Sequence, residues 1–332
     1  MDKIMLHAVA GSGKTSHIIS ELSLDESIAI ITYTRANQKE LRKKIIKRFK
    51  FIPKNIHIFG LFEFLYSFCY LPLQRKYPNK GICFEQPHFM FNGYHTKDGR
   101  IYSNKLSKFL IDNEIPYLQR IEKYFDKLFI DEVQDFGSFD FDWVLSLGKL
   151  EIPIVLVGDF YQSTFVTSRH GNKGKSLYEN YEKYKRYFKD SSFLIDEESL
   201  TASHRCSKNV CEFIQGNLGI QMTSHRADET IIAKVENPEE IVEIIENDNI
   251  KKLFYEKHYS FSCNSDNWGS SKGLTFDDVC VVLNPTTAKL FNGKLHSLAG
   301  KTLAKFYVAC SRTRGNLYFI EQKKISAKYK KE

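Results

Sequence analysis

The chain has 332 residues, of which 42% are hydrophobic and 27% charged, a balance that can bury one or two domain cores and excludes extended disorder. Its formal net charge of +8 suits a polyanionic partner, although a surplus of this size also occurs in proteins that bind no nucleic acid. The seven cysteines form no CxxC pair, which argues against a disulfide framework or a zinc site and favours the reducing cytoplasm. No apolar run is long enough to span a bilayer, so no membrane partner is expected.

Short apolar runs bounded by turn signals recur along the chain and predict β-strands. Helical patterns, such as the one over Asn37–Phe49, lie between several of these runs. Because strands that alternate with helices form parallel, doubly wound sheets, the sequence predicts an α/β fold, and its length fits two modest lobes. The predicted strands, in chain order, are Ile4–Ala8, Ile28–Thr32, Leu128–Ile130, Ile154–Val157, Val279–Leu283 and Leu317–Ile320.

Three other stretches bear on the domain organisation. Residues 63–125 lack the alternation and are rich in aromatic residues and lysine, which indicates an insertion into the first lobe. Those aromatic side chains form either a small core or a surface on which nucleic-acid bases stack. The Lys- and Tyr-rich stretch Leu177–Lys189 predicts a solvated helix at the boundary between lobes 1–190 and 191–332. The basic end, Lys323–Glu332, is expected to fray.

The segment Ala8–Thr15 follows a predicted strand and precedes the helical pattern Ser16–Leu22, which is the setting of a phosphate-binding loop. Its glycines let backbone N–H groups turn inward around phosphate oxygens, and the start of the helix adds a favourable partial charge. Lys14 would neutralise the β- and γ-phosphates, and Thr15 would ligate Mg²⁺. A strand, turn and helix with glycines by chance is the alternative. The residues expected at the nucleotide are Ala10, Gly11, Ser12, Gly13, Lys14, Thr15 and Ser16.

The apolar run Leu128–Ile130 ends in two acids, Asp131 and Glu132, at the position where an α/β sheet presents its ligand site. Asp131 would hold Mg²⁺ directly or through water, and Glu132 would accept a proton from the attacking water. Two adjacent acids can also mark a solvated strand exit. The phosphate loop earlier in the chain favours the catalytic interpretation.

Five further segments, in order along the chain, resemble motifs of the UvrD/Rep-type superfamily 1 DNA helicases. Thr32–Arg35 resembles the family's second motif, and Val157–Ser163 resembles the motif that follows Asp-Glu-Val-Gln-Asp. The other three resemble Asn-Tyr-Arg-Ser, Lys-Gly-Leu-Glu-Phe and Tyr-Val-Ala-x-Thr-Arg-Ala, and they are Leu200–Ser207, Lys272–Val279 and Tyr307–Arg314. Together with the phosphate loop, these segments span nearly the whole chain.

This resemblance implies two RecA-like P-loop NTPase lobes that hydrolyse ATP with Mg²⁺. It implies that Gln162 senses the γ-phosphate and that Arg205 and Arg312 reach the same phosphate from the second lobe, where guanidinium groups stabilise the charge that develops on its oxygens. His204 would lie on the adenine, and Gly273 would lie near the nucleotide. The candidate catalytic residues are therefore Lys14, Asp131, Glu132, Gln162, Arg205 and Arg312.

A strand partner is implied as well, namely single-stranded DNA, with RNA not excluded. The ring of Tyr33 would lie against a base. The full set of candidate strand contacts is Tyr33, Thr34, Arg35, Phe59, Arg169 and Lys272. The chain departs from the family at Thr275, where relatives carry glutamate. Between Arg205 and Lys272 it is too short for the large helical subdomain of full-length relatives, so we expect movement along a strand rather than duplex unwinding.

The expected function is therefore an ATP-dependent helicase or translocase on single-stranded DNA, in a phage, anti-phage or DNA-repair setting. One alternative is an ATP-gated regulatory subunit of a partner protein, such as a nuclease or a repair protein, that does not unwind processively. A P-loop kinase or metabolic NTPase is a further alternative, but it would need an acceptor site and has no use for two arginines from a second lobe.

Overall fold

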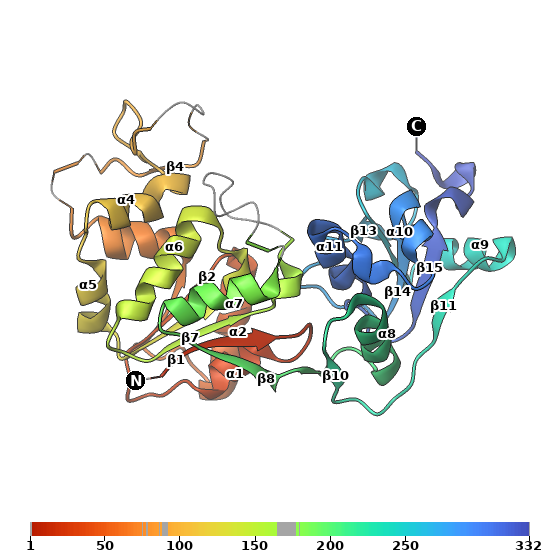
Figure 1. Ribbon diagram of the computed structural model, residues 1–332, viewed down its shortest axis with the longest axis horizontal. Coiled ribbons are helices and arrows are strands. Elements are labelled where there is room, and N and C mark those ends of the chain that lie inside the picture. Colours follow the sequence, from red (N-terminus) through yellow and green to blue (C-terminus); the bar gives the residue numbers. More distant parts are fainter. Residues whose placement is uncertain are drawn as a thin grey trace. The chain divides into compact units, whose positions relative to one another are not determined.

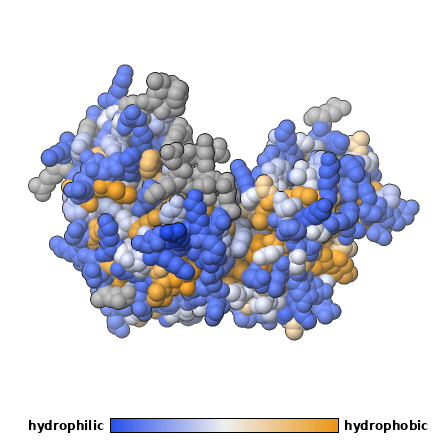
Figure 2. All heavy atoms as spheres, viewed as in Figure 1, coloured by the Kyte–Doolittle hydropathy of each residue, from blue (hydrophilic) through white to orange (hydrophobic). Residues whose placement is uncertain are grey.

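The computed structural model describes residues 2–74, 76–77, 79–85, 87, 92–164, 177–178 and 180–331. In these residues the chain has an α/β fold with parallel sheets, as the apolar runs predict, and it divides into two compact units (Figure 1). The first unit comprises Met1–His7, Lys14–Gly158 and Phe165–Glu197, and the second comprises Ala8–Gly13, Asp159–Thr164 and Glu198–Glu332. Hydrophilic side chains cover most of the visible face of each unit (Figure 2).

A six-stranded sheet forms the centre of the first unit, in the order β3-β2-β6-β7-β1-β8. The strands are β1 (Lys3–Ala8), β2 (Ile28–Thr32), β3 (Ile56–Gly60), β6 (Lys127–Asp131), β7 (Ile154–Gly158) and β8 (Leu194–Leu200). The first five in the sheet order pair in parallel. Every residue of β2 and β7 is buried, which explains their unbroken apolar sequences. Because β6, β7 and β1 are neighbours, their carboxyl ends meet at one edge of the sheet.

Two helices follow the strands that lead to the candidate sites. Helix α1 (Lys14–Ser20) comes directly after the glycine-rich loop, and α2 (Arg35–Phe49) comes after β2. The Thr34 side chain caps α2 by accepting a hydrogen bond of 3.1 Å from the backbone N–H of Asn37. The helix ends at Lys50, which has a left-handed backbone conformation. Thr34 thus has a structural role at the start of α2.

The predicted insertion consists of short elements with an aromatic core of its own. They are α3 (Leu61–Glu63), a π-helix (Phe64–Tyr70), β4 (Ile82–Cys83), β5 (Ile101–Tyr102), α4 (Leu106–Asp112) and α5 (Tyr117–Tyr124). The rings of Tyr70, Tyr77 and Tyr94 pack against Phe109, and the Tyr70 hydroxyl lies 2.8 Å from Nε2 of His95. Tyr70 and Phe109 are fully buried, so the core interpretation is correct for these two rings, whereas Tyr77 is 40% exposed.

Two further helices of the first unit, α6 (Ser138–Ser146) and α7 (Tyr181–Asp190), pack against each other. Helix α7 lies within the stretch where the sequence predicts a solvated helix, but only one side of it is exposed, and the other is buried. Tyr184 and Phe188 are fully buried, and both rings pack against Phe141 of α6. Charged residues are interspersed with the aromatic residues of this segment, and they obscure an apolar stripe at helical spacing.

The second unit contains a five-stranded parallel sheet in the order β11-β15-β14-β12-β13. Its strands are β11 (Ile232–Lys234), β12 (Ile250–Phe254), β13 (Ser265–Asn267), β14 (Asp278–Leu283) and β15 (Leu317–Glu321), and its helices are α8 (Lys208–Leu218), α9 (Pro238–Glu246), α10 (Pro285–Leu290) and α11 (Gly300–Cys310). One apolar cluster surrounds Trp268 and Phe306, and another surrounds Ile245 and Phe254. A short parallel pair, β9 (Ala202–Ser203) and β10 (Thr223–Ser224), completes the unit.

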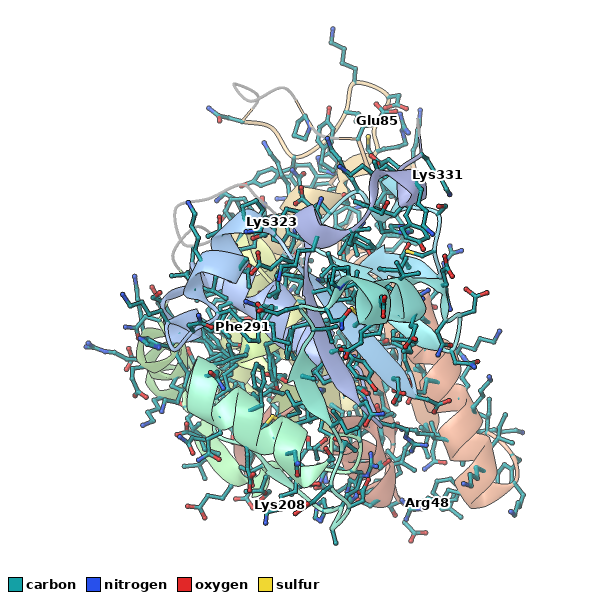
Figure 3. The ribbon with its side chains drawn as sticks, turned by 90° about the vertical axis from the view of Figure 1, so that its right-hand side faces the viewer. Arg48, Glu85, Lys208, Phe291, Lys323 and Lys331 are labelled. Carbon is teal, nitrogen blue, oxygen red and sulfur yellow. The ribbon has the colours of Figure 1, made fainter. Side chains whose placement is uncertain are left out.

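The basic end of the chain is docked on the second unit, so the expectation of a frayed terminus is wrong for residues 323–331. Ile325 and Tyr329 are buried in the second of these clusters. The backbone oxygen of Tyr329 accepts a hydrogen bond of 2.8 Å from the N–H of Ser262. Lys323 and Lys331 mark this segment in Figure 3. In the described part of the chain, no helix combines the length and apolar composition needed to cross a membrane.

Candidate nucleotide site

The glycine-rich loop after β1 depends on two glycines with positive φ, Gly11 at 75° and Gly13 at 91°. A Cβ atom on Gly11 would lie 2.7 Å from both the Cβ of Arg205 and the Oγ of Ser203, so no larger residue fits there. The Gly11 carbonyl accepts a hydrogen bond of 2.9 Å from the N–H of His204. Within the second unit, the loop therefore packs directly on the segment that carries Arg205.

Tyr307 on α11 holds the same loop from another direction. Its hydroxyl accepts a hydrogen bond of 2.8 Å from the N–H of Ala10 and donates one of 3.0 Å to Oδ2 of Asp159. Burial and the neighbouring Asp159 raise the pKa of Tyr307, so it keeps its proton and remains a donor. Reasoning from the sequence assigned no role to Tyr307 or Asp159, although both lie within the helicase-like segments and so could have been considered.

Glu132 is positioned by its own backbone and by two side chains. It has a left-handed conformation, with φ of 56°, which is uncommon for a residue with a side chain. Its Oε1 lies 3.9 Å from Nζ of Lys14, and Gln134 donates a hydrogen bond to its Oε2. At the end of β7, Gly158 leaves room for this turn, because a Cβ atom there would lie 2.5 Å from Oε1 of Gln134. Lys14 and Glu132, predicted from separate motifs, therefore meet in the first unit.

Asp131 lies at the end of β6 and is buried, with 3% of its surface exposed. Burial and the adjacent Glu132 raise its pKa to about 7, against the attraction of Lys14. Its Oδ1 has no hydrogen-bond partner among the described residues. A buried carboxylate oxygen without a donor matches a site for Mg²⁺, which prefers one or two carboxylates together with water and phosphate oxygens. The Asp131 carboxylate thus fits this ion.

The free energy of unfolding of the Asp131→Asn variant is expected to exceed that of the native protein by about 1–2 kcal/mol at pH 8 without Mg²⁺. In the folded protein Asp131 keeps its proton up to about pH 7. In the unfolded chain it ionises near its ordinary value, so the native protein loses stability as the pH rises through this interval. Urea unfolding of both proteins at pH 8 and pH 5 measures the difference in their free energies of unfolding, which should be smaller at pH 5. An equal gain at both values would contradict this account of Asp131.

Arg312, two residues after α11, is buried and makes several hydrogen bonds. Its Nη2 donates to Oε1 of Gln162 at 3.3 Å, and Nε donates to the carbonyl of Val308 at 3.0 Å. Gln162 in turn donates to Oδ2 of Asp159 at 2.7 Å. A continuous chain of hydrogen bonds therefore joins Arg312 to the backbone of the phosphate loop through Gln162, Asp159 and Tyr307.

The second predicted arginine lies close to the first. Arg205 is half-buried, and its Nη1 donates a hydrogen bond of 3.1 Å to the carbonyl of Ser311. Burial and the charge of Arg205 lower the pKa of Arg312. Two guanidinium groups held near one another are most favourable when an anion lies between or beside them. Both therefore lie where they could act on a phosphate bound by the loop.

The ring of His204 is exposed, and it stacks on His225 with 4.0 Å between centroids and an interplanar angle of 11°. No sequence motif includes His225, so this partner was not predicted. Gly273 is exposed with φ of 86°, and Lys272 beside it is half-buried.

Four of the candidate strand contacts, Tyr33, Thr34, Arg35 and Phe59, lie near the carboxyl ends of β2 and β3. Tyr33 is half-buried with its ring centroid 6.2 Å from that of Phe62, and Arg35 is exposed at the start of α2. Phe59 packs in an aromatic cluster with Phe64, Phe68, Phe125 and His57. Arg169 lies outside the described residues.

The parallel sheets, the phosphate loop and the paired arginines are all features of the superfamily 1 helicases, a class of enzymes that hydrolyse ATP. The family described as the viral superfamily 1 RNA helicase core domain matches residues 99–321, more than half of the chain. The chain belongs to this family. The assignment to superfamily 1 made from the sequence motifs is confirmed at this level, and the UvrD/Rep-type branch is part of the proposal below. No curated protein matched the chain.

Solved structures of an arterivirus helicase, nonstructural protein 10, have a similar fold. The complex of that helicase with DNA aligns with a TM-score of 0.54 at 18% identity, covering 96% of this chain and 61% of the helicase. The helicase alone aligns with a TM-score of 0.52 at 17% identity, covering 96% and 59%. This chain therefore spans about three-fifths of the length of those helicases.

Proposed function

We propose that the chain is an ATP-driven translocase on single-stranded nucleic acid, built on two functional lobes, 1–190 and 191–332, as in UvrD/Rep-type helicases. The single observation that best supports this is the hydrogen-bonded chain from the Ala10 N–H to the Arg312 guanidinium. Through such a link, the presence or loss of the γ-phosphate can change the positions of side chains at both ends of the site. Hydrolysis can then be coupled to movement.

In the proposed reaction, backbone N–H groups of Ala10–Gly13 surround the phosphates of ATP and Lys14 neutralises their charge. Thr15 and Asp131 would hold Mg²⁺, which would supply Lewis-acid stabilisation of the phosphate oxygens. Glu132 orients the attacking water and takes its proton, since Lys14 and Gln134 hold both of its carboxylate oxygens in place. The site residues Ser16, His204 and Gly273 complete the nucleotide contacts.

Arg205 and Arg312 supply the positive charge that the γ-phosphoryl group needs as it leaves. Such a guanidinium contributes about 10³–10⁵ in rate in other phosphoryl-transfer enzymes. Gln162 contacts Arg312 directly, and through Asp159 and Tyr307 it is connected to the loop. In our proposal this glutamine transmits the loss of the γ-phosphate to the strand-binding residues.

The proposed substrate is single-stranded DNA. Single-stranded RNA is the other candidate, because it presents the same phosphate backbone and stacking bases. The strand contacts proposed are Tyr33, Thr34, Arg35, Phe59, Arg169 and Lys272. An arterivirus helicase of similar fold was solved with DNA, which supports this choice for the present chain. The net charge of +8 adds a long-range electrostatic attraction to the phosphate backbone of the strand. The proposed compartment is the cytoplasm, consistent with seven free cysteines.

Oligo(dT) or oligo(U) is expected to raise the ATPase rate, and the strand concentration that gives half-maximal stimulation should rise steeply with salt. Because a stacked base contributes about 1–3 kcal/mol, Tyr33→Ala should raise that concentration roughly tenfold without changing the basal rate. Tyr259→Ala is the matched control, since Tyr259 is an exposed tyrosine of the second unit with 64% of its surface accessible. Indifference of the native protein to both strands would overturn the translocase proposal.

One observation favours the alternative of an ATP-gated regulatory subunit. In the second unit the chain between Arg205 and Lys272 forms α8, α9 and short strands, with no large helical subdomain among these described residues. Nucleotide binding would then order a surface for a partner, such as a nuclease in anti-phage defence or a repair protein, without stepping. ATP turnover that no strand stimulates, but that a partner protein alters, would support this alternative.

A further inference from the structure

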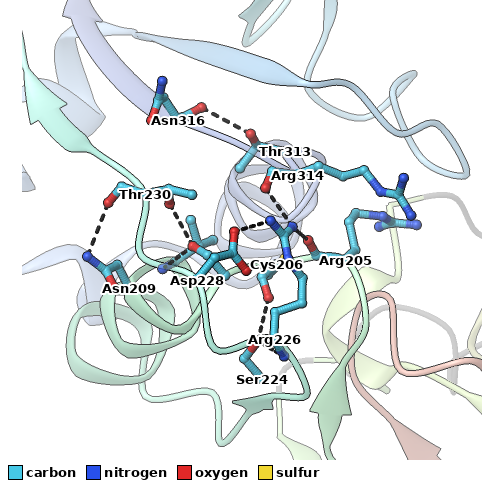
Figure 4. Close-up of polar contacts among 12 residues, drawn as sticks. Arg205, Cys206, Asn209, Ser224, Arg226, Asp228, Thr230, Thr313, Arg314 and Asn316 are labelled. Atoms are coloured by element: carbon cyan, nitrogen blue, oxygen red, sulfur yellow. Dashed lines mark hydrogen bonds and ion pairs between the residues drawn. The ribbon is translucent and has the colours of Figure 1, made fainter.

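The loop between α8 and β11 carries an arginine that none of the sequence motifs includes. The Nη1 atom of Arg226 donates hydrogen bonds to two backbone carbonyls, those of Arg205 and of Arg314, the latter at 2.6 Å. Its Nε and Nη2 bind the carboxylate of Asp228, with 2.8 Å from Nε to Oδ1. Figure 4 shows the Arg226 guanidinium between these three groups.

The two carbonyls belong to segments that are far apart in the sequence. Arg205 precedes α8, and Arg314 follows Arg312 by two residues after α11. One planar guanidinium therefore joins the backbones of the two segments that present the candidate γ-phosphate arginines. The Arg205 side chain adds a second link, because its Nη1 reaches the carbonyl of Ser311.

Further contacts fix the loop itself. The Oγ of Ser224 accepts a hydrogen bond from the N–H of Arg226 at 2.9 Å and donates one to the carbonyl of Cys206 at 2.8 Å. Farther along, the hydroxyls of Thr230 and Ser207 lie 2.6 Å apart. The loop is thus attached to the start of α8 on both sides of Arg226, which gives the guanidinium a defined position.

The ion pair between Arg226 and Asp228 does not by itself explain this arrangement. The Arg226 and Asp228 side chains are 27% and 47% exposed, and ion pairs at such exposure contribute about 0–1 kcal/mol. The unusual feature is the pair of carbonyl acceptors, because it sets the distance between two segments. Small errors in such distances matter in catalysis, where misplacement by about 1 Å can cost roughly 100-fold in rate.

We propose that Arg226, oriented by Asp228, is a positioning residue that holds Arg205 and Arg312 at the spacing required by the γ-phosphate. This inference rests on the proposed ATPase function. Arg226 and Asp228 would thus support the candidate nucleotide site from a loop that lies outside the helicase-like motifs.

Steady-state ATP turnover of Arg226→Ala and Asp228→Asn tests the proposal. For Arg226→Ala we expect kcat to fall by about 10- to 100-fold while KM for ATP changes less than about twofold, because transition-state geometry is lost and ground-state binding is kept. Asp228→Asn should give a smaller loss of the same kind, and it keeps the test valid if Arg226→Ala does not fold. Arg100→Ala is the matched control, because Arg100 also pairs with an aspartate two residues away, at 2.8 Å, in the first unit. Unchanged kcat in both Arg226→Ala and Asp228→Asn would overturn the proposal.

A double-variant cycle separates positioning from a general weakening of the fold. If Arg226 acts partly through Arg205, then Arg226→Ala should lower kcat clearly less in the Arg205→Ala background than in the native protein, because only the positioning of Arg312 remains to be lost. Equal losses in the two backgrounds would contradict the proposed role. If Arg205→Ala leaves kcat unchanged, the proposed ATPase mechanism fails. If Arg205→Ala lowers kcat and Arg226→Ala does not, only the positioning role fails.

Discussion

Lys14→Ala and Glu132→Gln should each reduce ATP turnover to less than about 1% of the native rate. Lys14 supplies the only charge of the loop itself, and Glu132 is the carboxylate held nearest to it, at 3.9 Å. Alanine removes the charge that balances the phosphates. Glutamine keeps the shape of the glutamate and its contact with Gln134, but it cannot accept a proton from water.

The two variants should differ in nucleotide binding, which makes the prediction more specific. Glu132→Gln should keep its affinity for ATP, whereas Lys14→Ala should lose it, and fluorescence titration with a nucleotide analogue measures both. Glu21→Gln is the matched control, since Glu21 pairs with Lys127 and His17 elsewhere in the first unit. Turnover well above 1% in a folded Lys14→Ala or Glu132→Gln variant would count against the site.

Arg312→Ala is expected to lower kcat by about 10³-fold, the low end of the range for an arginine that stabilises the γ-phosphoryl charge. The more informative substitution is Arg312→Lys, which keeps the charge. Arg312 makes hydrogen bonds to Gln162, Val308, Leu274 and Ser311 through three nitrogen atoms. One ammonium group cannot reach all four acceptors, so lysine should restore little of the activity.

Because Arg312 is buried, its replacement leaves acceptors such as Oε1 of Gln162 without a donor, and some loss of stability is expected. The thermal unfolding of Arg312→Lys should therefore be measured together with its kcat, to show that the variant is folded. Arg205→Ala, at a half-buried position, gives an independent measure with less risk to the fold. A folded Arg312→Ala variant with kcat within tenfold of the native protein would remove this residue from the mechanism.

The sequence was informative wherever chemistry follows from a short stretch of residues. The glycines and Lys14 form one local loop, and Asp131 and Glu132 directly follow a buried strand. Unbroken apolar runs such as β2 and β7 similarly indicate parallel strands that are covered on both faces. Local signals of this kind need no knowledge of the remaining chain.

Contacts between distant segments were not predictable in the same way. The hydrogen bond between Tyr307 and Asp159 joins residues 148 positions apart, and it depends on how α11 packs. The same holds for His225 on His204 and for Arg226 between two carbonyls. In α7 and the C-terminal segment, many lysines hid the apolar positions that dock them, Tyr184 and Tyr329 among them.

The most direct test of the account is a titration of the protein with MgADP in the presence and absence of aluminium fluoride, which mimics the γ-phosphoryl group in transfer. We predict that aluminium fluoride tightens binding to the native protein by at least about 100-fold, and that Arg205→Ala and Arg312→Ala bind MgADP normally but lose this tightening. If both variants tightened as strongly as the native protein, the phosphate loop and the two arginines would not serve one nucleotide, and the central claim would be wrong.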